Sequence, residues 1–352
     1  MERYARQHVM PVASQASLRV YVSEWENGKR SISDRYAVIL RNLLGVTDDE
    51  LRGAPSTVPQ VDGYDELLAR IDSASAVSQS MVKAFNDQTE LLRTMDRQLG
   101  AAHLVDQMAG HLAALEDALN FAVLPETRRP VALALAGAST LAAWQALDTG
   151  AVERAWRHYE LAKRAAQDAE APMYLAHAMA EQAYVLNEAG RPTMGVALIR
   201  GAQRAVGSHA SPRLRAWLYA AEAELCAYAG MPDDSRKALE RSSAALPAGA
   251  EDRDPDMVSI FLNEAHLTRW HGNVLAILGE AGAMGSLYSA LDVMDPSFVR
   301  AQAGLRCDLA HAHLTRGEYD QAQEHLRQAR LLASRTRSAR QRRRIELLST
   351  RL

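Results

Sequence analysis

Residues 308–322 read DLAHAHLTRGEYDQA, and this pattern is typical of two helices that fold back on each other at a glycine. Ala310 stands seven residues before Gly317, and Ala322 stands five residues after it. Two helices approach closely only where side chains are small, and glycine permits the tight turn between them. The stretch therefore predicts a helical hairpin.

The same pattern recurs from residue 125 to residue 352. Successive glycines, each with an alanine seven positions earlier, are separated by 40, 40, 42 and 45 residues. The glycines are Gly150, Gly190, Gly230, Gly272 and Gly317, and the alanines are Ala143, Ala183, Ala223, Ala265 and Ala310. Hairpins repeated in this way stack into an array that buries a continuous core and presents a concave groove. The alternative is an alanine-rich helical bundle without repeats.

The whole chain of 352 residues is expected to be all-α, because helical periodicity recurs along it and no strand pattern is evident. A Gly, Pro and Ser-rich stretch predicts a linker over 54–63. The expected domains are therefore a head over 1–53, connecting or dimerisation helices over 64–124, and the repeat domain over 125–352.

The composition argues against several classes of protein. The net charge of −3 argues neither for nor against nucleic-acid binding. No segment of about 20 apolar residues that would span a bilayer is found. The two cysteines, Cys226 and Cys307, are expected to be buried free thiols in a reducing cytoplasm. No metal-ligand or phosphate-loop motif is present, so we expect no metal, no cofactor and no enzyme activity.

The connecting segment carries an apolar heptad pattern. Tyr64, Ile71, Phe85, Leu92 and Leu99 share one position of the heptad. A repeat of this kind predicts a seam that packs on a partner helix, supplied either by a second subunit or by the repeat domain itself. Within the seam, Ile71, Phe85 and Leu92 are the candidates for a dimer contact.

The head carries the pattern of several short helices around a small core. A first buried stripe of Leu18, Val22 and Trp25 ends at Asn27-Gly28, and Ser33 is placed to cap the next helix. The inner face of that second helix is expected to hold Tyr36, Ile39, Leu40 and Leu43 before Gly45 ends it. Thr47-Asp48-Asp49-Glu50 reads as a capping box that opens a further helix.

The stretch VSEWENGKR (22–30), followed by a helix that ends in Leu43-Leu44-Gly45-Val46, resembles the Xre/Cro-type helix-turn-helix. In that family the helix that ends in this motif is the recognition helix of the major groove. The resemblance implies base contacts from Arg19, Val20, Tyr21, Ser23 and Glu24, and phosphate contacts from Asn27, Lys29 and Arg30. Only residues 1–8 precede the loop at 9–16, so the head is expected to lack the family's first helix.

The 308–322 repeat in turn resembles a tetratricopeptide motif, which predicts an α-solenoid. The whole layout resembles bacterial transcriptional regulators, some of which sense signalling peptides in the repeat groove. The expected function is therefore a DNA-binding regulator, acting as a homodimer on operator DNA in the cytoplasm, whose repeat domain binds a peptide or a small ligand. The alternative is a repeat scaffold for protein partners with a vestigial head.

The first helix of each tetratricopeptide pair lines the concave surface, so counting back from the turn glycines predicts the groove residues. The candidate ligand-binding residues are Tyr184, Asn187, Trp217, Glu224, Tyr228, His266, Arg269 and His311. Arg269 could hold a terminal carboxylate by two hydrogen bonds, and Asn187 could hold a peptide backbone. The arginine-rich run at 335–344 is expected to form the solvated face of a terminal helix.

Overall fold

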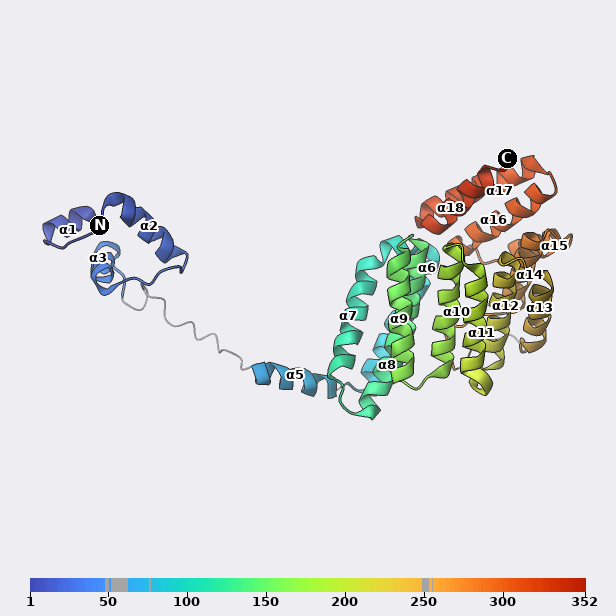
Figure 1. Ribbon diagram of the computed structural model, residues 1–352, viewed down its shortest axis with the longest axis horizontal. Helices are drawn as coiled ribbons and strands as arrows, with labels where there is room; N and C mark the ends of the chain where they lie inside the picture. The colour runs from blue at the N-terminus through green and yellow to red at the C-terminus, as the bar shows by residue number, and fades with distance from the viewer. Residues whose placement is uncertain (48–50, 52–62, 76, 249–252, 255) are drawn as a thin grey trace. The chain divides into compact units, whose positions relative to one another are not determined.

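The computed structural model describes residues 1–47, 51, 63–75, 77–248, 253–254 and 256–352 (Figure 1). Within these ranges the chain is all-α, as predicted, and contains no strand. It divides into two compact units, Met1–Ala69 and Arg70–Leu352. Apart from Gly63, the predicted linker at 54–63 lies outside the described residues, as do Asp48, Asp49 and Glu50 of the predicted capping box.

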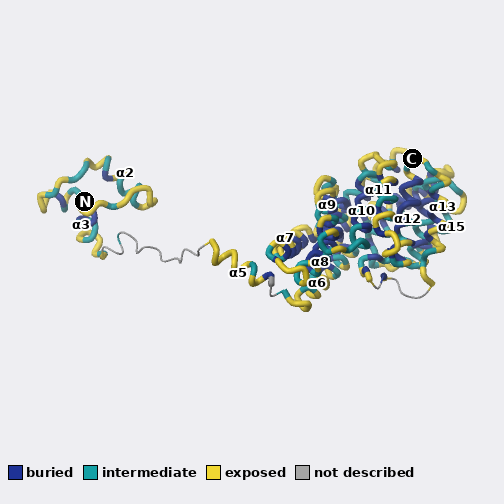
Figure 2. The backbone as a smooth tube through the Cα atoms, turned by 60° about the horizontal axis from the view of Figure 1, so that its bottom comes forward, coloured by how far each residue is buried: buried dark blue, intermediate teal, exposed yellow. Residues whose placement is uncertain are grey.

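The described part of the N-terminal unit contains the short helices α1 (Glu2–Gln7), α2 (Gln15–Glu26) and α3 (Asp34–Leu44), and also the start of α5 (Gly63–Ser75). Its buried core consists of Ala5, Leu18, Tyr36 and Ile39, and most of the surrounding chain is half-buried or exposed (Figure 2). Gly45 ends α3 in the left-handed conformation, as predicted, with φ of 68°. Leu43, expected on the inner face of α3, is instead 44% exposed.

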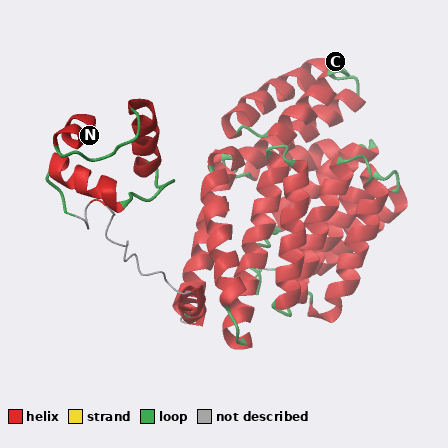
Figure 3. Cartoon of the chain, turned by 60° about the vertical axis from the view of Figure 1, so that its left-hand side comes forward, coloured by secondary structure: helices red, strands yellow, loops and turns green. Residues whose placement is uncertain are grey.

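The C-terminal unit is a series of helical hairpins, so the predicted helical repeat is confirmed at the level of paired helices (Figure 3). The pairs are α8 (Pro125–Asp148) with α9 (Val152–Asp168), α10 (Pro172–Glu188) with α11 (Pro192–Val206), α12 (Pro212–Tyr228) with α13 (Pro232–Ala245), α14 (Glu264–Leu278) with α15 (Ala283–Val293), and α16 (Val299–Thr315) with α17 (Tyr319–Thr336). Two short 3-10 turns, η1 (Ala101–His103) and η2 (Gly207–His209), lie between helices.

The sequence explains why the helices begin and end where they do. Proline is the first residue of α8 and of the four helices from α10 to α13, where its missing N–H and fixed φ suit a helix start. The turns after α8, α10, α12 and α16 contain a glycine with φ between 70° and 83°. In each of these helices the predicted small residue is fully buried; these are Ala143, Ala183, Ala223 and Ala310.

The fourth hairpin corrects the predicted register of the repeat. Gly272 is not a turn residue but lies inside α14, and the turn glycine is Gly279, with φ of 73°. Gly272 therefore takes the small-residue position that alanine holds in the other hairpins. A Cβ atom at Gly272 would come within 2.7 Å of Leu287 on α15, so this hairpin packs more closely than an alanine would allow.

Helix α8 combines length with an apolar composition. By length and composition it could cross a membrane, contrary to the expectation that no segment could. However, 78% of its most apolar window is buried, because α8 contacts α7, α9 and α10 as well as α6. Burial of this kind is typical of an apolar helix that belongs to a protein core.

The predicted heptad seam is interrupted. Helix α5 (Gly63–Ser75) ends before Ser78, whose side chain caps α6 (Gln79–Leu99), so the two halves are separate helices. Leu92 is buried, and Phe85 packs with it against α7 (Val105–Phe121) and α8. Phe85 and Leu92 are therefore used inside the chain and are not available as a dimer contact.

The two ends of the repeat unit meet. Helix α18 (Ala339–Ser349) follows α17 and contacts α8, while α16 and α17 contact α6 (Figure 1). The Ser338 hydroxyl donates a hydrogen bond of 2.6 Å to Asp148 Oδ1 at the end of α8. Gly100, with φ of 87°, passes so close to α17 that a Cβ atom there would lie 2.1 Å from the Thr336 carbonyl oxygen. The repeat series is thus closed on itself.

Candidate functional site

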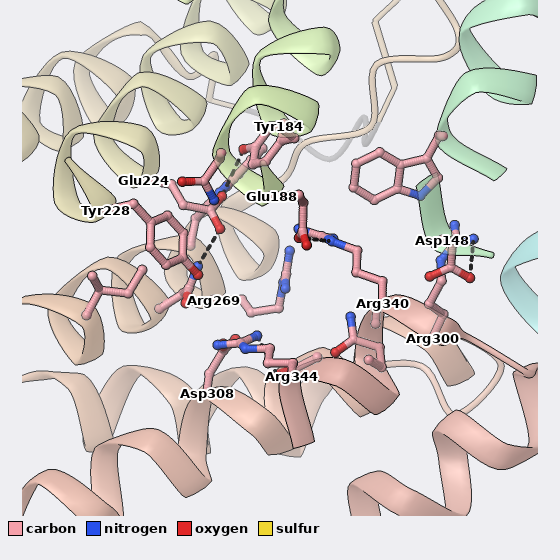
Figure 4. A pocket seen from close by; sticks show the side chains of 18 of the residues that line it. Asp148, Tyr184, Glu188, Glu224, Tyr228, Arg269, Arg300, Asp308, Arg340 and Arg344 are labelled. Carbon is pink, nitrogen blue, oxygen red and sulfur yellow. Dashed lines mark hydrogen bonds and ion pairs between the residues drawn. The ribbon is translucent and has the colours of Figure 1, made fainter. Parts of the chain in front are cut away.

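A cavity of about 820 Å³ lies on the inner side of the repeat unit (Figure 4). The first helix of each hairpin contributes to its wall, and α18 contributes the opposite wall. All eight predicted ligand-binding residues line this one cavity: Tyr184 and Asn187 from α10, Trp217, Glu224 and Tyr228 from α12, His266 and Arg269 from α14, and His311 from α16. The eight positions therefore share one surface, although His266 and Arg269 were counted back from Gly272, which lies inside α14 and is not a turn glycine.

One wall is organised around a buried carboxylate. Glu224 is 9% exposed and accepts three hydrogen bonds from neutral donors. Tyr184 Oη and Trp270 Nε1 donate to Oε2 at 2.8 and 2.7 Å, and Asn273 Nδ2 donates to Oε1 at 2.9 Å. Burial, together with the Glu224 charge, raises the pKa of Tyr184 well above its ordinary value. The predicted groove residues Tyr184 and Glu224 thus bind each other and fix the shape of this wall.

Trp270 and Asn273 were not predicted, although the sequence contains a signal for them. His266 and Arg269 are already placed on the inner face of α14, and residues three to four positions further along a helix share that face. Trp217 meets Trp270 edge to face, with ring centroids 5.8 Å apart, so it supports the wall as well as lining it.

The opposite wall is cationic. Arg340 Nε donates to Glu188 Oε1 at 2.8 Å, and Arg344 forms an ion pair with Asp308. Both arginines belong to the 335–344 run, which was expected to be a solvated face. That expectation is wrong for these two, because α18 turns them toward the array; Arg335, Arg337, Arg342 and Arg343 are exposed.

Arg300 extends the cationic wall toward the closed end of the unit. It forms ion pairs with Asp96 at 2.6 Å and with Asp148 at 3.8 Å. Arg300 and Arg340 also lie over the ring of Trp144, 5.9 and 5.2 Å from its centroid. These contacts occupy the faces of Trp144 with protein cations.

Arg97 and Arg269 also line the cavity, and neither has an ion-pair partner among the described residues. Arg97 packs against Phe261 and Phe298, 5.5 Å from each ring centroid. Burial, and then the like charges of Arg93 and Arg253, lower the pKa of Arg97 to about 10, so it stays charged at neutral pH. Arg269 has a buried Nε–H for which the described part of the chain provides no acceptor.

Two buried amide oxygens in the cavity are also left without a donor in the described chain. Asn273 is 5% exposed and Gln341 is 7% exposed, and neither Asn273 Oδ1 nor Gln341 Oε1 has a hydrogen-bond partner there. His311 lies nearby. Burial, followed by the charges of Arg344 and Arg351, lowers the pKa of His311 to about 4, so its ring is neutral. The cavity therefore combines unused donors and unused acceptors.

A second titratable cluster lies between α15, α16 and α17. Arg306 can only donate, so His325 Nδ1 accepts from it at 3.1 Å and His325 Nε2–H donates to Tyr288 Oη at 3.0 Å. Tyr288 Oη then donates to His313 Nε2 at 2.9 Å, and His313 Nδ1 donates to Glu318 at 2.6 Å. Every polar atom named has a partner, which makes this cluster a structural network.

The head places the predicted DNA-contacting residues on two sides of α2. Arg19, Val20 and Ser23 are exposed together, as is Lys29 beyond the helix. Tyr21 was expected to be exposed but packs inward beside Trp25 and Tyr36, with ring centroids about 6 Å away.

The remaining predicted residues of the head interact locally. Glu24 forms an ion pair of 3.4 Å with Arg30, whose guanidinium also lies 4.1 Å from the Tyr21 ring centroid. Asn27 Nδ2 donates to the carbonyl of Ser23 at 2.7 Å, which ends α2. Val22 and Trp25, expected to be buried, are only half-buried.

The fold and the cavity define an all-helical protein with hairpin repeats, a closed repeat unit and a separate small helical unit. Neither a family model nor a curated protein matches this chain.

Proposed function

We propose that this protein is a DNA-binding transcriptional regulator whose tetratricopeptide-like repeat domain binds a peptide or a small ligand. The observation that carries the proposal is the 820 Å³ cavity with buried polar atoms that the described chain leaves without partners. Leaving such atoms unsatisfied costs about 1–3 kcal/mol each, so a cavity of this kind favours a ligand that satisfies them.

The head supports the DNA-binding half of the proposal. Arg19, Val20 and Ser23 form an exposed face on one side of α2, and Lys29 follows in the next loop. Arginine and short polar side chains on one helix face suit base edges in the major groove, and lysine suits phosphates. Tyr21 is removed from the set of base-contacting residues, because it belongs to the core of the head.

A selection experiment tests this half directly. The full-length protein is incubated with random-sequence duplex DNA at low salt, and bound sequences are recovered and measured by fluorescence anisotropy. We expect Arg19→Ala to weaken the free energy of binding to the selected DNA by about 1–3 kcal/mol and to relax specificity at one base position. Lys29→Ala should instead weaken binding to all sequences alike and reduce the salt dependence.

Arg236→Ala is the matched control, because Arg236 is an exposed arginine of the C-terminal unit that pairs with Asp233 and Glu280. It should leave DNA affinity unchanged. If the wild-type protein binds no duplex at low salt and instead co-purifies with a stable protein partner, the scaffold alternative replaces the regulator.

The proposal includes a homodimer acting in the cytoplasm, since two-fold operators are read by two-fold proteins. Leu92 is buried and the half-buried Phe85 packs beside it within the chain, so the apolar residues of α5 become the candidate contact. Leu67 and Leu68 of α5 are 44% and 55% exposed. Replacing both with Glu should convert a dimer to a monomer in light scattering. A wild-type monomer at tens of micromolar, with and without DNA, contradicts this part of the proposal.

A further inference from the structure

We propose that the cavity binds a small aromatic carboxylic acid that carries an amide or amine N–H, as an N-acylated aromatic amino acid does. The inference rests on the proposed ligand-binding function and narrows it to one chemical class. Three separate features of the cavity support it: its size, the polar atoms it leaves unpaired, and the position of its uncovered aromatic rings.

The size and the boundary of the cavity favour a small molecule. Pockets of about 300–1,000 Å³ enclose drug-sized ligands, and this cavity measures about 820 Å³. Helix α18 occupies one side of the concave surface with Arg340, Arg344 and Leu348. A long extended peptide would have to displace α18 and break the Arg340–Glu188 and Arg344–Asp308 pairs. A compact ligand leaves them intact.

The unpaired acceptors require N–H groups on the ligand. Glu224 can only accept a hydrogen bond when ionised, so Asn273 must present Nδ2 to it and turn Oδ1 away. Asn273 Oδ1 and Gln341 Oε1 are then buried acceptors without donors in the described chain. A ligand N–H that reaches either oxygen removes the penalty of leaving it unpaired.

The charges of the cavity require an anion. Each acidic side chain in the cavity wall already has a partner. Glu224 accepts from three neutral donors, Glu188 pairs with Arg340, and Asp308 pairs with Arg344. Asp148 contacts Ser338 and Arg300, and Glu181 contacts Tyr159 and His177. Arg97 and Arg269, by contrast, have no ion-pair partner among the described residues. A carboxylate placed between the two walls meets a guanidinium by charge-assisted hydrogen bonds.

The aromatic rings locate the apolar part of the ligand. Trp144, Phe261 and Phe298 are each covered by an arginine. Trp217, Trp270 and Tyr228 also line the cavity, and no cation stacks on them within the described chain. Trp217 and Tyr228 lie on α12, and Trp270 lies on α14, which also carries Asn273 and Arg269. A planar apolar group therefore fits beside the same residues that call for an N–H and a carboxylate.

Three matched probes test the assignment with the full-length protein: N-acetyl-L-phenylalanine, its carboxamide, and 3-phenylpropanoate. The first has the ring, the acid and the amide N–H; the second lacks the acid; the third lacks the amide. We expect N-acetyl-L-phenylalanine to raise the melting temperature and to give calorimetric binding. The other two should bind at least about tenfold more weakly, because each leaves a buried polar group unpaired.

Two variants separate the contacts from folding. Arg269→Gln should reduce the affinity for N-acetyl-L-phenylalanine about tenfold while leaving the affinity for the carboxamide unchanged. Gln341→Met keeps the length of the side chain and should reduce the advantage of N-acetyl-L-phenylalanine over 3-phenylpropanoate. Arg236→Gln, outside the cavity, is the control and should change neither ratio. Ratios between probes are insensitive to a general loss of stability.

Equal binding of all three probes, or binding of none at about 10 mM, overturns the ligand class. DNA binding is measured on the same preparation, so the two proposals fail separately. If the protein binds DNA but none of the probes, the proposed regulator function stands and the proposed aromatic-acid ligand is rejected. If the protein binds the probes in the expected order but binds no DNA, the proposed ligand class stands and the proposed regulator function is rejected.

Discussion

The two units of this chain build their cores in different ways. The repeat unit buries many alanines, and each of its five described hairpins has a small residue seven positions before the turn glycine, so paired helices pack closely. The head has few buried residues and relies on contacts among Tyr21, Trp25 and Tyr36. Many small, repeated contacts make the repeat unit sensitive to added volume, whereas a few large side chains make the head sensitive to removed volume.

The largest effect is expected where the repeat unit closes. Gly100→Ala introduces a Cβ atom 2.1 Å from the Thr336 carbonyl oxygen and strains a backbone with φ of 87°. We expect a loss of roughly 3–5 kcal/mol in the free energy of unfolding of the repeat unit, measured by urea denaturation. Gly110→Ala is the control, since the space around that exposed helical glycine is open. It should be neutral or stabilising by about 0.5–1 kcal/mol.

Acid should destabilise the repeat unit through its buried histidines. Burial, followed by the charges of Arg306 and His313, lowers the pKa of His325 from 6.5 to about 4. Below pH 6.5 the unfolded chain binds a proton that the folded ring does not, so stability is full above pH 6.5 and falls toward pH 4. The expected loss is roughly 3 kcal/mol at pH 4 for this residue.

His325→Gln should flatten this pH dependence in urea melts followed from pH 7 to pH 4. The only histidine of the head, His8, is exposed, so the head should not share the transition. An unchanged slope in the variant would assign the acid effect to other groups.

A smaller effect tests the aromatic core of the head. The hydroxyl of Tyr36 accepts a hydrogen bond of 3.1 Å from the Ala13 N–H. Tyr36→Phe should lower the free energy of unfolding of the head by about 1 kcal/mol and leave that of the repeat unit unchanged. The loss should appear as faster amide hydrogen exchange in residues 1–45 alone. Exchange rates that stay at wild-type values would show that this hydrogen bond does not stabilise the head.

The smallest effect is expected on the outer face of the array. Arg157 and Glu153 form an exposed ion pair one turn apart on α9. Arg157→Ala should change the free energy of unfolding by only about 0.3–0.5 kcal/mol. A change above 1 kcal/mol in thermal or urea melts would contradict the view that the small buried residues carry the stability of the repeat unit.

Local features of this fold could be predicted from the sequence, because they depend on residues close together in the chain. The turns at Gly150, Gly190, Gly230 and Gly317, and the cavity positions counted back from them, follow from helical spacing. The inward position of Tyr21 could have been predicted as well, since it lies three residues after Leu18 and four before Trp25. Gly272 was wrongly taken for a turn residue because the connection between α13, which ends at Ala245, and α14, which begins at Glu264, is longer than the others and shifts the register of that repeat.

The closing wall of the cavity could not be predicted in this way. Arg340 and Arg344 lie far along the sequence from Glu188 and the α12 residues that they face. Their inward position depends on the path of the whole array, which brings α18 back to α8. Within the run at 335–344, spacing alone does not distinguish the two arginines that line the cavity with ion-pair partners from their exposed neighbours.

Closure also limits how this chain can change its length. An open solenoid gains or loses a repeat at either end, because each hairpin touches only its neighbours. Here α18 and α17 meet α8 and α6, and Gly100 fits directly against Thr336. Inserting or deleting one hairpin would separate these surfaces. The number of repeats is therefore fixed by geometry, and variation is expected as substitutions in the cavity wall rather than as added or lost hairpins.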